Sequence, residues 1–217
     1  MTGFKTVSLA DQVFERLEND IITGLYPRGE ILTELKLVEQ LGVSRTPIRE
    51  ALRRLEQERL IEETGKGSLV LGITVEDLMD IMAIRKRIEG LAAYHATKNM
   101  TEEGRKELTR INELQEFYFS KMDLEHLRQM DDRFHDTIYA LCGSTVIRDT
   151  LRPLHRKTQR YRKASIENPQ RLAKSIEEHN AIFAAIMSGN AELADRLITE
   201  HIGKAEKNMV ERFGYYG

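Results

Sequence analysis

Side chains that can bind a divalent metal are concentrated in the second part of the chain. All six histidines lie after residue 90. Asp131 and His135, in "LRQMDDRFHDTIYALCG", are four residues apart and therefore share one face of a helix. Together with His179 and His201, which fall in later apolar series, they give three imidazoles and one carboxylate, a donor set that suits a borderline divalent metal. The same pattern also fits histidines that are hydrogen-bonded residues of a core, so both interpretations stay open from the residues alone.

A second group of functional side chains lies in "VSRTPIREALRRLEQERLI", residues 43–61. Arg45, Arg49 and Arg53 are spaced i, i+4, i+8, which aligns them on one side of a helix. Apolar residues form the opposite, core-facing stripe: Ile48, Leu52 and Leu55. Arginine can bond bidentately to guanine or to phosphate, so this face is suited to DNA. Pairing with the glutamates of the same segment would instead give an ordinary solvated charged face.

Short elements surround this arginine helix. A capping box at Ser8 and Asp11 predicts a first helix that ends at "GLYPRG". Thr33 caps a short second helix that closes at Gly42, and the arginine helix runs from near residue 44 to about residue 59. The run "LIEETGKGSLVLG" then changes period and predicts a hairpin, in which Lys66 lies between two glycines. Three helices and a hairpin form a helix-turn-helix with a possible wing, although the hairpin alone also fits an ordinary tight turn.

The rest of the chain predicts helices only. Their expected ranges are 75–98, 102–121, 124–142, 145–165, 170–188 and 191–212, with breaks at glycine, proline and asparagine clusters. The fold class is therefore mainly α, with a winged helix-turn-helix domain over residues 1–72 and an all-α six-helix bundle over residues 73–217.

Composition narrows the function. The chain has 217 residues and a formal net charge of -2, which argues against a general polyanion binder and makes any nucleic-acid site local. No apolar run is long enough for a membrane span and the start lacks a signal-peptide core, so we expect a cytoplasmic protein without a membrane partner. One cysteine, Cys142, excludes an intrachain disulfide framework and a cysteine-based zinc finger.

The segment "LGVSRTPIREALRRLEQERLIEETGKGSLV" resembles the winged helix-turn-helix of GntR-type bacterial transcription regulators. The resemblance implies that Arg45 and Arg49 contact operator DNA and that Gly67 sits at the minor groove. The full set of expected DNA-binding residues is Arg45, Thr46, Arg49, Arg53, Lys66 and Gly67. Leu35 stands where some relatives have an arginine, so that additional DNA contact is not expected.

The segments "IRKRIEGLAAYHA", "DDRFHDTIYALCG", "EEHNAIFAAIMSGNAELA" and "EHIGKA" resemble the FCD effector domain of the FadR subfamily. The resemblance implies a metal site made of Asp131, His135, His179 and His201. Zinc or nickel is preferred for these ligands, and manganese or iron is also compatible. We expect His126 and His155 at the surface, while His95, on an apolar stripe of its own, is not assigned.

Arg85 lies one turn before apolar residues and is expected to be half-buried or inward. It can pair with Glu89 or bind a ligand carboxylate, and the structural pair is the simpler interpretation. Asp132 and Asp136 should point away from the metal face, which leaves no free general base beside it except Glu89.

Taken together, these features predict a regulator, not an enzyme. The resemblance implies a homodimeric repressor that binds a palindromic operator and responds to a small carboxylate effector near the metal. Two rival interpretations are a metal-dependent hydrolase-like enzyme and an architectural DNA-binding protein with a purely structural helical domain.

Overall fold

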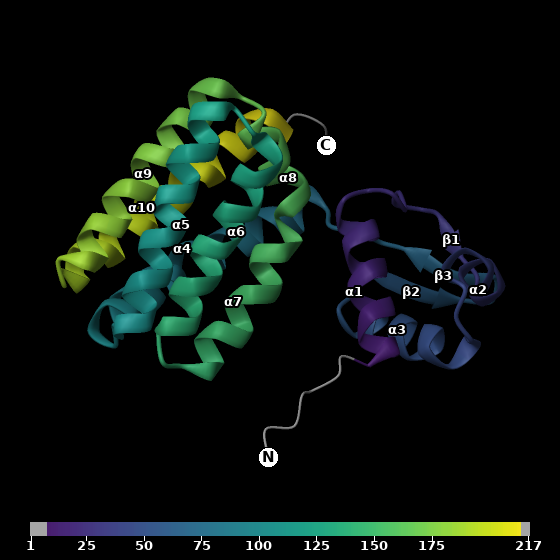
Figure 1. Cartoon of the computed structure of the whole chain (residues 1–217). Coiled ribbons are helices and arrows are strands. Elements are labelled where there is room, and N and C mark those ends of the chain that lie inside the picture. Colours follow the sequence, from purple (N-terminus) through teal and green to yellow (C-terminus); the bar gives the residue numbers. More distant parts are fainter. Residues whose placement is uncertain (1–7, 214–217) are drawn as a thin grey trace, which may run out of the picture. The chain divides into compact units, whose positions relative to one another are not determined.

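The computed structural model describes residues 8–213, except for the side chains of residues 160, 163–165 and 212–213 (Figure 1). The chain divides into two compact units between Thr74 and Val75. Helices dominate both units, and the mainly α fold class is confirmed. None of the described helices is long and apolar enough to cross a membrane.

The N-terminal unit combines three helices with a small antiparallel sheet. Its elements in chain order are α1 (Leu9–Ile22), β1 (Ile31–Leu32), α2 (Glu34–Leu41), α3 (Arg45–Gln57), β2 (Ile61–Thr64) and β3 (Gly67–Val70). The strand order is β1-β3-β2. The sequence predicted the β2–β3 hairpin but not β1, because two residues are too few for an alternating pattern to show. Strand β1 is fixed by its partner, with Ile31 opposite Leu69 and Leu32 opposite Ser68.

Helix ends in this unit follow the predicted capping signals. Ser8 and Asp11 form a capping box at the start of α1, and the Thr33 hydroxyl accepts the Lys36 N–H at the start of α2. Gly42 ends α2 with a left-handed φ of 67°. Helix α3 ends two residues before the expected position, since Arg59 adopts a φ of +56°, outside the helical region.

A separate hydrophobic core holds the N-terminal unit together. It joins α1 to α3 and to the sheet, and its fully buried members include Leu17, Leu32, Ile48 and Leu55. The apolar stripe predicted on α3 is therefore buried as expected. Burial of this stripe fixes which side of α3 faces solvent.

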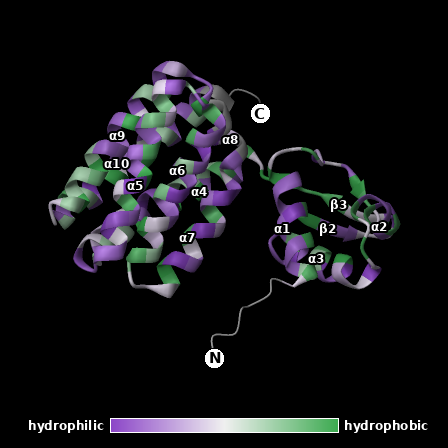
Figure 2. Cartoon of the chain, in the orientation of Figure 1, coloured by the Kyte–Doolittle hydropathy of each residue, from purple (hydrophilic) through white to green (hydrophobic). Residues whose placement is uncertain are grey.

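The C-terminal unit is all-helical. Its helices are α4 (Val75–Lys98), α5 (Glu102–Lys121), α6 (Leu124–Leu141), α7 (Thr145–Lys157), α8 (Gln159–Ile166), α9 (Pro169–Met187) and α10 (Ala191–Phe213). Both colours of the hydropathy scale occur around these helices, as expected of amphipathic helices that share one core (Figure 2). Helix α10 packs along α4, and α9 packs against α5 and α10.

Six helices were expected in this unit, whereas the described residues form seven, because the predicted helix 145–165 is divided at Thr158. The Thr158 hydroxyl donates to the carbonyl of His155 and accepts a hydrogen bond from Arg85 Nη1 at 3.1 Å. Threonine hydroxyls compete in this way with the helical pattern. The break therefore arises from a contact with α4 that the local sequence does not reveal.

Candidate metal centre and nucleic-acid interface

Three buried histidines from three helices meet in the core of the C-terminal unit. His135 of α6, His179 of α9 and His201 of α10 are 1%, 1% and 5% exposed. One ring nitrogen from each lies within 4.8 Å of those of the other two. The Nε2 atoms of His179 and His201 are 3.3 Å apart. Two nitrogens bound to one zinc at about 2.0–2.1 Å in tetrahedral geometry are separated by roughly 3.4 Å, so this spacing fits a shared ion.

The outer nitrogens of these rings are held by neighbouring polar groups. The Nδ1 partners are Glu89 Oε2 at 2.9 Å for His135, Glu178 Oε2 at 2.7 Å for His201 and the Gln115 amide at 3.1 Å for His179. The Gln115 Oε1 atom has no partner among the described residues, and exchange of the amide oxygen and nitrogen lets it accept from Nδ1–H. Hydrogen bonds from Nδ1–H to these groups fix the tautomer that leaves Nε2 free to bind a metal. The donor set therefore fits a divalent ion.

Burial favours the neutral form of His179 and His201. Removal from water lowers the pKa of His179 well below its usual value, and it also lowers the pKa of His201. The His201 shift persists although Glu178 opposes it. Burial raises the pKa of Glu178, but hydrogen bonds from His201 and Arg171 prevail and lower it to about 2. Neutral rings beside ionised carboxylates are the protonation states that metal coordination requires.

Asp131, the fourth expected ligand, lies next to this group. Its Oδ1 atom is 3.7 Å from His179 Nε2, and its Oδ2 atom accepts a hydrogen bond from Arg162 of α8. Burial would raise the Asp131 pKa, but the positive charge of Arg162 outweighs it and holds this pKa well below the usual range. The four residues predicted from the sequence are thus brought together, with Asp131 shared between the histidines and an arginine.

The expectation that His155 lies at the surface is wrong. His155 is 2% exposed, and its Nδ1 atom is 2.9 Å from Arg85 Nη2. Arginine has no acceptor, so Nδ1 must accept and Nε2 must carry the proton that it donates to Asp132 Oδ1 at 3.1 Å. This tautomer has no free lone pair for a metal. His155 lies four residues after the fully buried Leu151 and so shares its helix face, and this spacing could have predicted the burial of His155.

The expectation that Asp132 points away from the site is also wrong. Its Oδ1 atom accepts hydrogen bonds from both His155 and Arg162. Consecutive residues on a helix differ by about 100°, and α7 and α8, which supply His155 and Arg162, pack against α6 on the side of Asp132. Asp136 lies 3.7 Å from Arg152 instead.

Arg85 and Glu89 form the expected structural pair. The Arg85 Nε to Glu89 Oε1 distance is 2.6 Å, and the two side chains are 2% and 0% exposed. Burial opposes the charge on Glu89, yet Arg85 and His135 hold its pKa well below the usual range. Glu89 therefore links the arginine to a metal-ligand candidate.

A small cavity opens beside the histidines; the centre of a water-sized sphere can occupy about 40 Å³ of it, and part of it is open to solvent. Arg85, Asp131, His135 and His201 line one part of it. Such a cavity can hold a small molecule in contact with a metal-bound position.

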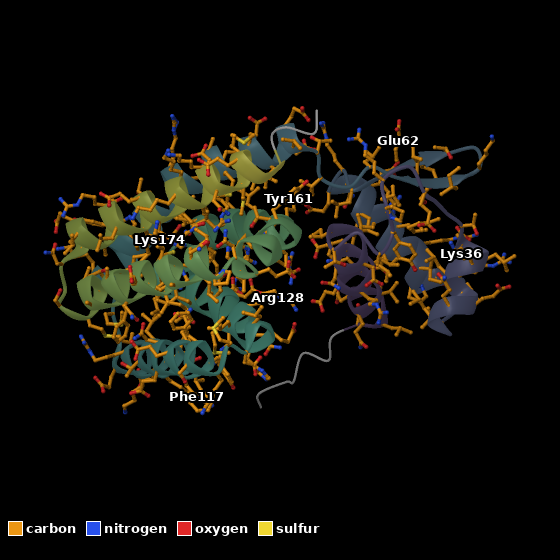
Figure 3. The ribbon with its side chains drawn as sticks, turned by 90° about the horizontal axis from the view of Figure 1, so that it is seen from above. Lys36, Glu62, Phe117, Arg128, Tyr161 and Lys174 are labelled. Atoms are coloured by element: carbon orange, nitrogen blue, oxygen red, sulfur yellow. The ribbon has the colours of Figure 1, made fainter. Side chains whose placement is uncertain are left out.

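The arginine face of α3 is open to solvent. Arg45, Thr46, Arg49 and Arg53 are all exposed, opposite the buried stripe. Arg49 Nε contacts Glu34 Oε1 of α2 at 2.6 Å, a pair that a phosphate or base can replace. Lys36 and Glu62 project from this unit as well (Figure 3), and Lys36 pairs with Glu30. The expected side chains therefore lie on one exposed face, and Leu35 on α2 is 58% exposed.

The fold of the N-terminal unit itself requires glycine at position 67 of the hairpin. Its φ is +130°, and a Cβ atom built there would lie 2.6 Å from the Leu32 carbonyl oxygen of β1. Close approach of two strands thus requires glycine at this position. Gly65, across the exposed Lys66, has open space around it.

An exposed arginine helix in a winged helix-turn-helix, followed by an all-helical unit, is the arrangement typical of DNA-binding transcription regulators. Residues 9–70 match the gntR family of bacterial regulatory proteins, and residues 80–204 match the FCD domain. The chain belongs to the GntR family of transcription regulators and carries an FCD domain. These families and the curated relatives are regulators, not enzymes.

Individual relatives agree with this assignment over nearly the whole chain. The HTH-type transcriptional repressor RspR of Escherichia coli K12 is 25% identical over 205 residues, covering 94% of this chain and 90% of the relative. A probable D-xylose utilization operon transcriptional repressor of Paenarthrobacter nicotinovorans is 28% identical and covers 90% and 86%. The solved structure of E. coli McbR/YncC superposes with a TM-score of 0.81 at 25% identity, covering 96% of this chain and 100% of that one.

Proposed function

We propose that this protein is a homodimeric repressor that binds a palindromic operator and responds to a small carboxylate bound beside a metal ion. The observation that carries the DNA-binding part is the exposed stripe of Arg45, Arg49 and Arg53 on a helix whose other side is buried. Two relatives that are named repressors support repression. A regulator of operator DNA acts in the cytoplasm.

In the proposed complex, α3 enters the major groove and the hairpin acts as the wing. Arg45, Arg49 and Arg53 contact base edges or phosphates, and Thr46 contacts the backbone near the start of the helix. Lys66, at the tip of the hairpin, contacts phosphate next to the minor groove, and Gly67 keeps the hairpin close to β1. A twofold dimer places two such helices in successive major grooves, which requires a palindromic site.

The helical unit is proposed to hold one divalent ion through His135, His179, His201 and Asp131. Zinc or nickel fits three imidazoles and a carboxylate best, and manganese or iron is compatible. The ion would supply a positive charge and open coordination positions for a carboxylate of the effector. The residues of the chain do the rest: Glu89, Glu178 and Gln115 orient the rings, and Arg85 lines the cavity as a candidate contact for the ligand. Preferential binding to one dimer conformation would then change the affinity for DNA.

The DNA-binding proposal is tested by selection of bound sequences from a pool of random duplexes with the full-length protein. The expected result is an enriched inverted repeat, and a particle mass of twice 25.1 kDa by analytical ultracentrifugation. Arg45→Ala and Arg49→Ala should each weaken binding to the selected duplex by roughly 5- to 100-fold. A selected site without twofold symmetry would refute the dimer on a palindrome.

The metal proposal is tested by elemental analysis of the purified protein. We expect about one equivalent of divalent metal, lost in His135→Ala and in His179→Ala. His126→Ala is the matched control, because that histidine is exposed and pairs with Asp123 outside the cluster. A parent protein that takes up no metal after incubation with zinc or nickel would refute the site.

A further inference from the structure

Two arginines that line the cavity each carry a buried N–H donor without a partner. These donors are Arg162 Nε and Arg171 Nη1, and no hydrogen-bond acceptor for them occurs among the residues that the structure describes. Arg162 Nη1 and Nη2 donate to Asp131 and Asp132, and Arg171 Nη2 donates to Glu178. Buried donors are nearly always satisfied in native proteins, so an exception that borders a cavity indicates an acceptor supplied by a ligand.

Position along the helices places the Arg171 donor away from the metal ligands. Ser175, which also lines the cavity, is four residues before His179 on α9, about 6 Å along the helix axis. The Arg171 side chain runs from the preceding turn towards Glu178 and so passes this level of α9. Arg171 is linked to the metal ligands through Glu178, whose Oε2 atom also lies 2.7 Å from His201 Nδ1. An acceptor for Arg171 Nη1 is therefore a different ligand atom from a metal-bound carboxylate, a few carbon atoms away from it.

Beyond this level the cavity is apolar. Its lining there comes from α8, α9 and α10: Ile166, Leu172, Ala205 and Met209. Met209 lies eight residues after His201 on α10, about 12 Å along the helix. A ligand that fills the cavity ends in an apolar group, not in a second charge.

The net charge of the site also favours a ligand with a single negative charge. The charged groups that surround the site and are at most about one third exposed comprise three arginines and four carboxylates: Arg85, Arg162, Arg171, Glu89, Asp131, Asp132 and Glu178. Their sum is -1, and one divalent ion makes it +1. A single carboxylate neutralises that charge, whereas a dicarboxylate would leave a buried excess of negative charge.

We propose that the ligand of this cavity is a monocarboxylate with an uncharged oxygen, hydroxyl or keto, in the middle of a short chain and an apolar end. Arg171 Nη1 donates a hydrogen bond to this oxygen and thereby selects ligands that carry it. This inference rests on the proposed metal and carboxylate site and adds the chemical class of the ligand.

The test compares six-carbon acids by calorimetry with the full-length, metal-loaded protein. The probes are hexanoate, 3-hydroxyhexanoate, 4-oxohexanoate, 5-oxohexanoate and hexanedioate. At least one oxygenated monocarboxylate should bind roughly tenfold more tightly than hexanoate and than hexanedioate, the amount expected of one hydrogen bond to a charged donor. In Arg171→Met this preference over hexanoate should fall to about one.

Lys204→Met is the matched control. Lys204 Nζ also contacts Glu178, at 3.4 Å, but its side chain is 58% exposed and does not line this cavity. The control should keep the tenfold preference, and both variants should keep their metal. Hexanoate or hexanedioate binding at least as tightly as every oxygenated acid, or an unchanged preference in Arg171→Met, would overturn the inference. Failure of all five acids to bind the metal-loaded protein would instead refute the carboxylate effector itself.

Discussion

The two units use the same side chain in opposite environments. On α3, Arg45, Arg49 and Arg53 are exposed, whereas in the helical unit Arg85 and Arg162 are 1% and 8% exposed. An exposed guanidinium is hydrated by solvent and can bind a partner without leaving a buried charge unpaired. A buried one requires a carboxylate at close range, and both arginines of the helical unit have one. The comparison teaches that the exposed arginines of α3 are available for binding, while the buried Arg85 and Arg162 also hold the helical unit together.

Replacement of Arg85 should have the largest effect on stability. Arg85→Ala leaves Glu89 charged and buried beside a single remaining partner, His135. Loss of one member of a buried pair costs about 3–5 kcal/mol of unfolding free energy. Urea denaturation of the full chain measures this loss.

Arg53→Ala is the matched control for that comparison, since its side chain is exposed on the binding face. Its unfolding free energy should stay within about 0.5 kcal/mol of the parent. Equal losses for the two variants would contradict the distinction between the two environments.

Acid should destabilise the helical unit of the metal-free protein and spare the N-terminal unit. Burial lowers the pKa values of His155, His179 and His201 in the folded state, whereas histidines of the unfolded chain take up protons near pH 6.5. The unfolded state therefore binds more protons as the pH falls, and stability is lost below about pH 6.5. From pH 6.5 to 5.5 the three groups together amount to at most about 3 kcal/mol.

Hydrogen exchange after chelation, at pH 7.5, 6.5 and 5.5, measures each unit separately. The N-terminal unit is an internal control because all six histidines lie after residue 90. Protection of its core amides, corrected for intrinsic exchange, should change little over this range. Equal losses of protection in both units would show that the buried histidines are not the cause.

A smaller effect is expected at the hairpin. Gly67→Ala brings a Cβ atom against the Leu32 carbonyl oxygen and forces an unfavourable φ, which should cost about 1–3 kcal/mol. Gly65→Ala, two residues earlier and in open space, should change stability by no more than about 0.5 kcal/mol. Thermal denaturation of both variants measures these changes in stability. If the Gly67→Ala protein is as stable as the parent, the fold does not require this glycine, and its role is restricted to DNA contact.

Periodicity predicted the helices and the arginine face because each is a property of one segment. The capping residues Ser8 and Thr33 and the buried stripe on α3 followed from local sequence. Periodicity failed where a distant helix supplies the partner. Arg85 of α4 contacts both His155, which is buried, and Thr158, at which the predicted helix is divided. Strand β1 was missed for a similar reason, since only its pairing with β3 defines it.

The smallest effect on stability is expected at Glu34, together with a few-fold effect on DNA binding. Glu34 holds Arg49 at 2.6 Å on the exposed surface, and such surface pairs contribute no more than about 1 kcal/mol. Glu34→Gln should leave the melting temperature nearly unchanged but should tighten binding to the selected duplex a few-fold, because it frees Arg49 and removes a negative charge that faces phosphate. Arg49→Ala should weaken the same binding and reduce the salt dependence by about one phosphate contact. Fluorescence anisotropy over a series of salt concentrations measures both. If Glu34→Gln binds DNA more weakly than the parent, the pair positions Arg49 for the operator, and the exposed face is pre-organised in the same way as the buried one.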